Sequence, residues 1–253
     1  MVNKQHGFTL VEIAIVLVII GLLLGGILKG QELITAARVR NLADQAASVQ
    51  AAYYGFIDRY RAVPGDMLAS QVCGAIGNNP AWSCPTGVGG AATAPGGNGQ
   101  IDATVWSEAA AAWSHMTFAG FLQGNYPGTA NAETAYVSTA TPAAPRNPWN
   151  GFLLLARTND YRPAAPGQAP RLHLITGRNV PVNVMREMDV KVDDSAPDSG
   201  ILRSAPLTDT STSFGNVGGS DATTACVTVG TATTPSIWNI NGASADCNGY
   251  FLY

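Results

Sequence analysis

The chain has 253 residues, a formal net charge of −3 and only 12% charged residues. This length suits one large domain or one domain with appendages. The basic residues are scattered and form no long run, so the sequence gives no sign of a nucleic-acid partner. The charged share is about half of the usual 25%, and the many small polar residues are typical of an exported surface protein.

An apolar run follows the first seven residues. Between residues 8 and 28 the only ionisable residue is Glu12, and the others are almost wholly Ile, Val, Leu, Ala and Gly. The run predicts a membrane-spanning helix, because about 20 helical residues cross the hydrocarbon core of a bilayer. A charged side chain in such a helix costs about 2.5–3.5 kcal/mol near the bilayer centre. Glu12 therefore requires a partner that the helix alone does not supply.

The segment Gly7-Phe8-Thr9-Leu10-Val11-Glu12, after a short basic leader, resembles the processing motif of type IV prepilins and type II secretion pseudopilins. In that family a prepilin peptidase cuts after the glycine and methylates the new N-terminal amine. The resemblance implies that residues 1–7 are a leader peptide, that Gly7 is the cleavage residue and that Phe8 is the methylated N-terminus. It also implies that Glu12 meets the Phe8 amine of a neighbouring subunit.

The same resemblance implies a structural subunit of a type IV pilus-like filament, which polymerises with other pilin subunits through its N-terminal helix. The implied partners are the prepilin peptidase, an inner-membrane assembly platform and, before assembly, the membrane. The precursor would be a single-pass inner-membrane protein, and the mature chain would lie in an extracellular filament. Two alternatives stay open: a pseudopilin in a periplasmic pseudopilus, and a membrane-anchored extracytoplasmic binding protein that never polymerises.

The helical pattern continues beyond the apolar run. Apolar residues recur at intervals of three and four, which marks one face of a helix. This stripe consists of Val39, Leu42, Ala46, Val49, Tyr53, Phe56 and Tyr60. The sequence therefore predicts one helix over residues 8–61, ended by Pro64-Gly65. Residues 8–28 would be its membrane and assembly half, and residues 29–61 its amphipathic half.

Residues 62–253 are expected to form a globular α+β head. Gly and Pro crowd residues 85–99, 127–148 and 163–170, which predicts loops. Helices are expected at residues 106–122 and 179–189, and strands at residues 151–157, 171–176, 225–229, 236–240 and 250–253. The alternation in residues 171–176 predicts a half-buried strand. The predicted fold is α+β and type IV pilin-like, with the long helix packed on an antiparallel sheet.

A second resemblance involves three pieces of the head. Pro64-Gly65-Asp66, residues 97–101 and the tryptophan-bearing helix near Trp106 and Trp113 resemble a subset of larger type IV pilin-like proteins. In those proteins a Pro-Gly-Asp turn precedes such a helix. The aromatic stripe is expected to be core packing rather than a ligand site.

The four cysteines predict disulfides. They are Cys73, Cys84, Cys226 and Cys247. An even number in an exported chain, without a Cys-x-x-Cys spacing, favours disulfides over metal ligation. Three pairings are open, and proximity in the sequence favours Cys73–Cys84 with Cys226–Cys247.

Four aspartates cluster late in the chain: Asp189, Asp193, Asp194 and Asp198. Ca²⁺ prefers several oxygen ligands, and some pseudopilins bind calcium in head loops. The cluster therefore predicts a structural calcium site, and no other cofactor is expected. The spacing does not fit an EF-hand, and acidic turns capped by Asp are common, so a purely structural role is the alternative.

The sequence gives little support for catalysis. His6 would leave with the leader, and His115 and His173 lie far apart without a zinc-binding spacing. There is no Gly-x-Ser-x-Gly elbow, no phosphate-binding glycine loop and no His-Glu-x-x-His. We expect a protein that is not an enzyme, in which His115 and His173 have structural roles.

Overall fold

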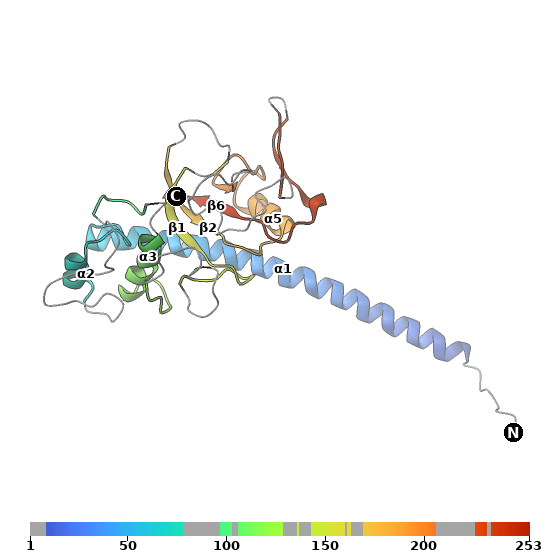
Figure 1. Ribbon diagram of the computed structural model, residues 1–253. Coiled ribbons are helices and arrows are strands. Elements are labelled where there is room, and N and C mark those ends of the chain that lie inside the picture. The colour runs from blue at the N-terminus through green and yellow to red at the C-terminus, as the bar shows by residue number, and fades with distance from the viewer. Residues whose placement is uncertain are drawn as a thin grey trace, which may run out of the picture.

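The computed structural model describes residues 9–77, 97–102, 106–128, 136, 143–159, 161–162, 169–205, 226–231 and 234–253. Figure 1 shows one long helix that runs under the head and projects far beyond it. The elements in chain order are α1 (Leu10–Tyr60), α2 (Ala69–Ala75), α3 (Trp106–Phe118), β1 (Leu154–Thr158), β2 (Arg171–Ile175), α5 (Val182–Val192), β3 (Leu202–Ser204), β4 (Val227–Thr228), β5 (Ile237–Trp238), the 3₁₀ helix η3 (Ile240–Gly242) and β6 (Gly249–Leu252).

Helix α1 has nearly the predicted length, but it ends differently. Its 51 residues stop at Tyr60, and Arg61 follows in the left-handed conformation with φ 53°. The Arg61 N–H donates to the Ile57 carbonyl at 2.8 Å, as in a left-handed helix cap. The helix therefore ends before Pro64-Gly65 is reached, and Arg61, rather than that dipeptide, closes it.

One half of α1 packs into the head and the other half does not. Six members of the predicted stripe are buried, from Val39 to Phe56, and the seventh, Tyr60, packs against the core while partly exposed. None of residues 9–38 is buried. In the structure, α1 thus has an unburied part, residues 9–38, and a part packed on the head from Val39 onward.

The head is built on a four-stranded antiparallel sheet in the order β1-β2-β6-β3. The C-terminal strand β6 lies inside the sheet, with Phe251 opposite both Leu174 and Leu202. Strands β4 and β5 form a separate two-stranded sheet in which Val227 pairs with Trp238. The α+β architecture with a long N-terminal helix is as predicted.

Several element boundaries differ from the prediction. Helix α3 stops at Phe118 and α5 spans Val182–Val192, whereas the predicted ranges were 106–122 and 179–189. Helix α2 and strand β3 were not predicted. With seven and three residues respectively, both are too short for a periodic pattern to identify them.

The prediction that β2 is half-buried is wrong. His173, Leu174 and Ile175 are all buried. The second face of the strand is covered by aromatic rings, because the Tyr161 and Tyr250 ring centroids lie 4.7 and 5.7 Å from that of His173. Burial lowers the pKa of His173 to about 4, so the ring is neutral at physiological pH.

The Asn147 side chain ties the segment before β1 to the end of β2. Its Nδ2 donates to the carbonyls of Thr176 and Arg178 at 2.7 and 3.0 Å. Its Oδ1 accepts the backbone N–H groups of Trp149 and Gly151 at 2.8 and 2.9 Å. The residue is only 4% exposed, so one buried carboxamide satisfies four backbone groups.

The Pro-Gly-Asp turn connects three separate segments. The Gly65 N–H donates to His115 Nδ1 on α3 at 2.9 Å, and burial lowers the pKa of His115 to about 4, which keeps this nitrogen an acceptor. The Asp66 carboxylate accepts the backbone N–H groups of Gly97 and Gly99, each at 2.6 Å. The second family resemblance thus corresponds to a structural junction of α1, α3 and residues 97–99.

Next to this junction lies a fully buried acid, Glu108. Its Oε2 accepts the backbone N–H of Asp102 at 2.7 Å. Burial raises the pKa of Glu108 to about 7, and the charges of Asp102 and Asp66 add to the increase. The folded head therefore holds this proton more tightly than the unfolded chain does.

This raised pKa predicts that Glu108→Gln stabilises the head increasingly as pH rises. An acid whose folded pKa is raised stabilises at low pH and loses that stabilisation between its unfolded pKa, near 4.5, and about 7. Gln has no proton to lose, so its advantage over Glu should grow from near zero at about pH 4.5 to at most about 3 kcal/mol at about pH 8. Urea unfolding of the full chain in detergent, followed by tryptophan fluorescence, measures the difference.

The matched control is Glu187→Gln. Glu187 is a surface residue of α5 whose carboxylate lies 2.6 Å from Lys191 Nζ, and exposed pairs contribute little. Its substitution should change the unfolding free energy by less than about 1 kcal/mol at every pH. A Glu108→Gln difference that stays constant between pH 4.5 and 8 would contradict the assigned ionisation.

Candidate functional site

Helix α1 begins with a closed capping box at the predicted assembly segment. Thr9 is the N-cap, and its Oγ1 accepts the backbone N–H of Glu12 at 3.3 Å. In return, Glu12 Oε2 accepts both the backbone N–H and the hydroxyl of Thr9, each at 2.8 Å. Gly7 and Phe8, the predicted processing residues, lie outside the described residues. The box itself is a Thr-x-x-Glu signature that the sequence reveals but that we did not use.

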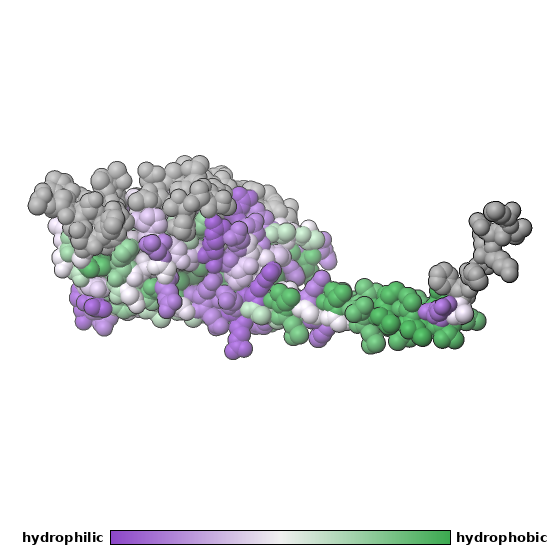
Figure 2. Space-filling model, turned by 90° about the horizontal axis from the view of Figure 1, so that it is seen from below, coloured by the Kyte–Doolittle hydropathy of each residue, from purple (hydrophilic) through white to green (hydrophobic). Residues whose placement is uncertain are grey.

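The first half of α1 exposes a continuous apolar surface. Figure 2 shows this surface as a mainly hydrophobic stretch, with a hydrophilic patch near its free end, that projects from a more hydrophilic head. Within the described residues, α1 is the one helix long and apolar enough to cross a membrane, and the apolar window is not buried at all. By length and composition alone, this fits a membrane-anchored precursor.

Comparison with known proteins bears on the same segment. Residues 2–28 match the family model described as the prokaryotic N-terminal methylation motif. The match confirms the resemblance seen at Gly7–Glu12. It supports a protein of the type IV pilin or pseudopilin type, and such a motif implies processing by a prepilin peptidase and pilin-type assembly in general. No curated protein and no solved structure matches the chain.

Disulfides stabilise the head. Cys226 and Cys247 are bonded, with Cα atoms 5.8 Å apart, and join the start of β4 to the segment before β6. This is the pairing that sequence proximity favours. Cys73, on α2, is also disulfide-bonded, and its expected partner Cys84 lies outside the described residues.

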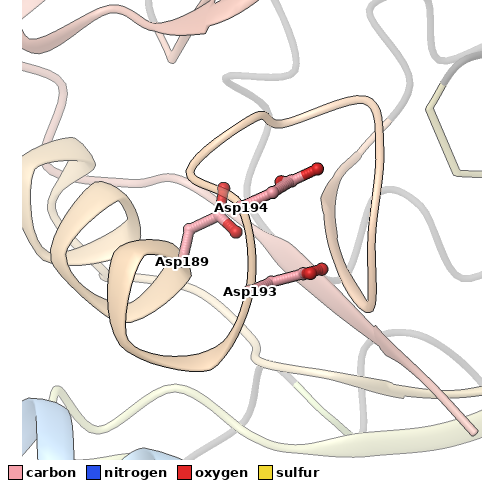
Figure 3. A group of neighbouring side chains, drawn as sticks. All are labelled: Asp189, Asp193 and Asp194. Atoms are coloured by element: carbon pink, nitrogen blue, oxygen red, sulfur yellow. The ribbon is translucent and has the colours of Figure 1, made fainter.

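Three of the four clustered aspartates come together at the end of α5. Figure 3 shows Asp189 on the helix, with Asp193 and Asp194 on the turn that follows it. One carboxylate oxygen from each lies within 4.8 Å of the others. Asp198 does not belong to this group, because it lines a separate pocket with Arg162. The predicted set of four ligands is thus reduced to three.

Two of these carboxylates accept hydrogen bonds from nearby backbone N–H groups, so they have a structural role without a bound cation. Asp194 Oδ1 accepts the Ala196 N–H at 2.9 Å, and Asp193 Oδ2 accepts the backbone N–H of Ile201 and, at 3.3 Å, that of Leu202. These bonds close the turn between α5 and β3. The sequence analysis left open a purely structural role for the aspartates as the alternative to calcium binding, and these hydrogen bonds are of that kind.

Asp189 is different because it is fully buried. Its Oδ2 accepts the Trp238 indole N–H of β5 at 2.7 Å, whereas Oδ1 makes no hydrogen bond of standard geometry with a described residue. Burial raises the pKa of Asp189 to about 6, and the charges of Asp194 and Asp193 also raise it. At neutral pH the site thus holds three mutually repelling carboxylates, an arrangement whose oxygen donors fit Ca²⁺.

Calcium binding to this acidic turn remains a prediction with a direct test. Titration calorimetry of the full chain in detergent measures the heat of Ca²⁺ binding and the Kd. At about 100 times that Kd, Ca²⁺ should stabilise the chain by about 2.7 kcal/mol, which thermal unfolding measures. Asp189→Asn should abolish this stabilisation. The matched control Asp198→Asn should keep it, because Asp198 lies outside the group of three. No heat and no thermal shift with the wild-type chain would remove the site.

Proposed function

We propose that the chain is a structural, non-enzymatic subunit of a type IV pilus-like filament. It is made as a single-pass inner-membrane precursor, loses residues 1–7 to a prepilin peptidase and polymerises through α1 with other pilin subunits on an inner-membrane assembly platform. The observation that supports this most strongly is the combination of the methylation motif with an apolar helix segment that no described residue of the chain buries.

The exposed half of α1 supports polymerisation on energetic grounds. Before assembly, lipid covers its apolar surface. In a filament, the corresponding helices of neighbouring subunits replace lipid contacts with protein contacts. The head remains outside, because its core buries residues of α1 from Val39 onward and none of residues 9–38. A disulfide-closed head suits an oxidising extracellular surface.

The capping box gives Glu12 two separable roles. Its Oε2 is used by Thr9 within the subunit, which leaves Oε1 to accept a charged amine from a neighbour. The N-terminal amine of Phe8 would be that partner. Such a pair sets the axial register, because a subunit out of register would leave both charges unpaired in an apolar core.

Co-expression with a prepilin peptidase and assembly machinery tests the proposal. Mass spectrometry should show a chain that begins at Phe8 and carries one methyl group, and electron microscopy should show filaments. Deletion of the gene distinguishes a pilus from a pseudopilus: surface filaments are lost in the first case, and exoprotein secretion in the second. A processed chain that stays dispersed in the membrane would instead favour an anchored binding protein.

Substitutions of Glu12 separate capping from charge pairing. Glu12→Gln keeps an acceptor for Thr9 but removes the charge, and Glu12→Val removes both. Both variants insert more easily into a membrane, so a defect would arise in assembly. We expect at least about tenfold fewer filaments from each, because an unpaired buried charge costs several kcal/mol. Thr9→Val, the control for the cap, should assemble normally, and a Glu12→Gln variant that does the same would refute the pairing.

A further inference from the structure

A polar hollow of about 370 Å³ lies on the head, and none of its lining residues belongs to α1 or to the group of Asp189, Asp193 and Asp194. Its lining includes Arg162, which follows β1, Asp198, which precedes β3, and a stretch of the β4–β5 hairpin with Gly230, Thr231, Thr234 and Ser236. The volume is at the lower end of the range for small-molecule sites, about 300–1,000 Å³. Most sites of that kind are apolar, but polar groups form this one.

The floor of the hollow is a buried guanidinium. Arg162 is only 7% exposed, and its Nη2 donates to Ser236 Oγ at 3.2 Å. Its backbone is fixed on both sides, since its N–H donates to the Ser204 carbonyl and its own carbonyl accepts from Arg203 Nη1. No carboxylate of the described residues forms an ion pair with it. A buried cation without a paired anion costs free energy, and hydrogen bonds from its N–H groups to a ligand would reduce this cost.

The Asp198 carboxylate lines the same hollow. It makes no hydrogen bond and no ion pair among the described residues. Burial lowers the pKa of Arg162, and the negative charge of Asp198 partly offsets this decrease. The two side chains thus lie near each other without touching. A ligand between them could satisfy both.

We propose that this hollow binds a small neutral saccharide. The two charged lining residues cancel, so neither a simple anion nor a simple cation is strongly favoured. A guanidinium only donates hydrogen bonds and a carboxylate only accepts them. A sugar hydroxyl does both, so adjacent hydroxyl groups on one ring can accept from Arg162 and donate to Asp198. The Ser236 hydroxyl accepts the Gly230 N–H at 3.0 Å as well as the guanidinium, which leaves its own proton for a ring oxygen.

The test uses the full chain in a detergent without a sugar headgroup, since glucoside and maltoside detergents would compete. Glucose, galactose, mannose and N-acetylglucosamine are titrated separately, with saturation-transfer NMR as the readout. Binding is expected in the millimolar range, which corresponds to about −4 kcal/mol. Asp198→Ala and Asp198→Asn both remove the carboxylate, which makes no hydrogen bond within the described fold, and a cooperative unfolding curve verifies that each variant is folded. Each should weaken binding at least about tenfold.

Asp58→Ala is the matched control, because Asp58 is an exposed carboxylate on α1 that only faces Arg61, at 3.5 Å. It should bind the same sugar with unchanged affinity. The proposal is overturned if no sugar binds at about 50 mM, well above a millimolar Kd. It is also overturned if sulfate or glycine binds and the sugars do not, or if the Asp198 variants bind as well as the wild type.

Discussion

Replacing Asn147 by Asp is expected to lower the unfolding free energy of the head by about 3 kcal/mol or more. The carboxamide donates to two backbone carbonyls, those of Thr176 and Arg178, in a position that is almost fully buried. An aspartate would remove both donors and place a negative charge against two carbonyl oxygens. Each buried group left without a partner costs about 1–3 kcal/mol, and repulsion adds to this.

Urea unfolding of the full chain measures this loss through tryptophan fluorescence, because Trp106, Trp113, Trp149 and Trp238 lie in the described part of the head. Asn41→Asp is the control, since it makes the same chemical change at an exposed position of α1 and should cost less than about 0.5 kcal/mol. The deficit of Asn147→Asp should shrink in acid, where the carboxyl group becomes neutral and regains a donor. Equal effects of the two substitutions would show that the Asn147 contacts do not stabilise the head.

Removing the Cys226–Cys247 disulfide is expected to have the second large effect. The bond closes a loop with a sequence separation of 21, which in terms of loop-closure entropy stabilises by about 3 kcal/mol. That loop contains β4, β5 and η3, whose short strands pair only with each other. The double substitution Cys226→Ser with Cys247→Ser should therefore destabilise the loop before the four-stranded sheet.

Two measurements distinguish local destabilisation of this loop from destabilisation of the whole head. Unfolding curves of the double variant under non-oxidising conditions give the free energy, and hydrogen exchange shows where protection is lost. Either single substitution should cost about as much as the double one, because both remove the same bond. A double variant as stable as the wild type, with unchanged protection of Val227 and Trp238, would mean that packing alone holds the hairpin.

The N-terminal processing and assembly segment could be predicted from the sequence because the residues that define it are neighbours in the chain. The apolar run, Glu12 and the flanking glycine lie within a few residues of one another, and their order identified the motif that the family model also matches. The acidic turn was predicted only in part. Asp189, Asp193 and Asp194 lie close together in the sequence at one helix end, but whether Asp198 joins them depends on the path of the turn.

The sequence by itself determined α1 and its two halves, because a 3.6-residue period shows which residues share a face before any partner is known. It also indicated five of the six strands in the main and second sheets, all except β3. Only the tertiary structure decided that β6 lies between β2 and β3, that aromatic rings cover the His173 face of β2, and that Asn147, Glu108 and Arg162 are buried. Each of these features depends on contacts between segments far apart in the chain. No local sequence pattern specifies which distant strand or ring will pack against a given residue.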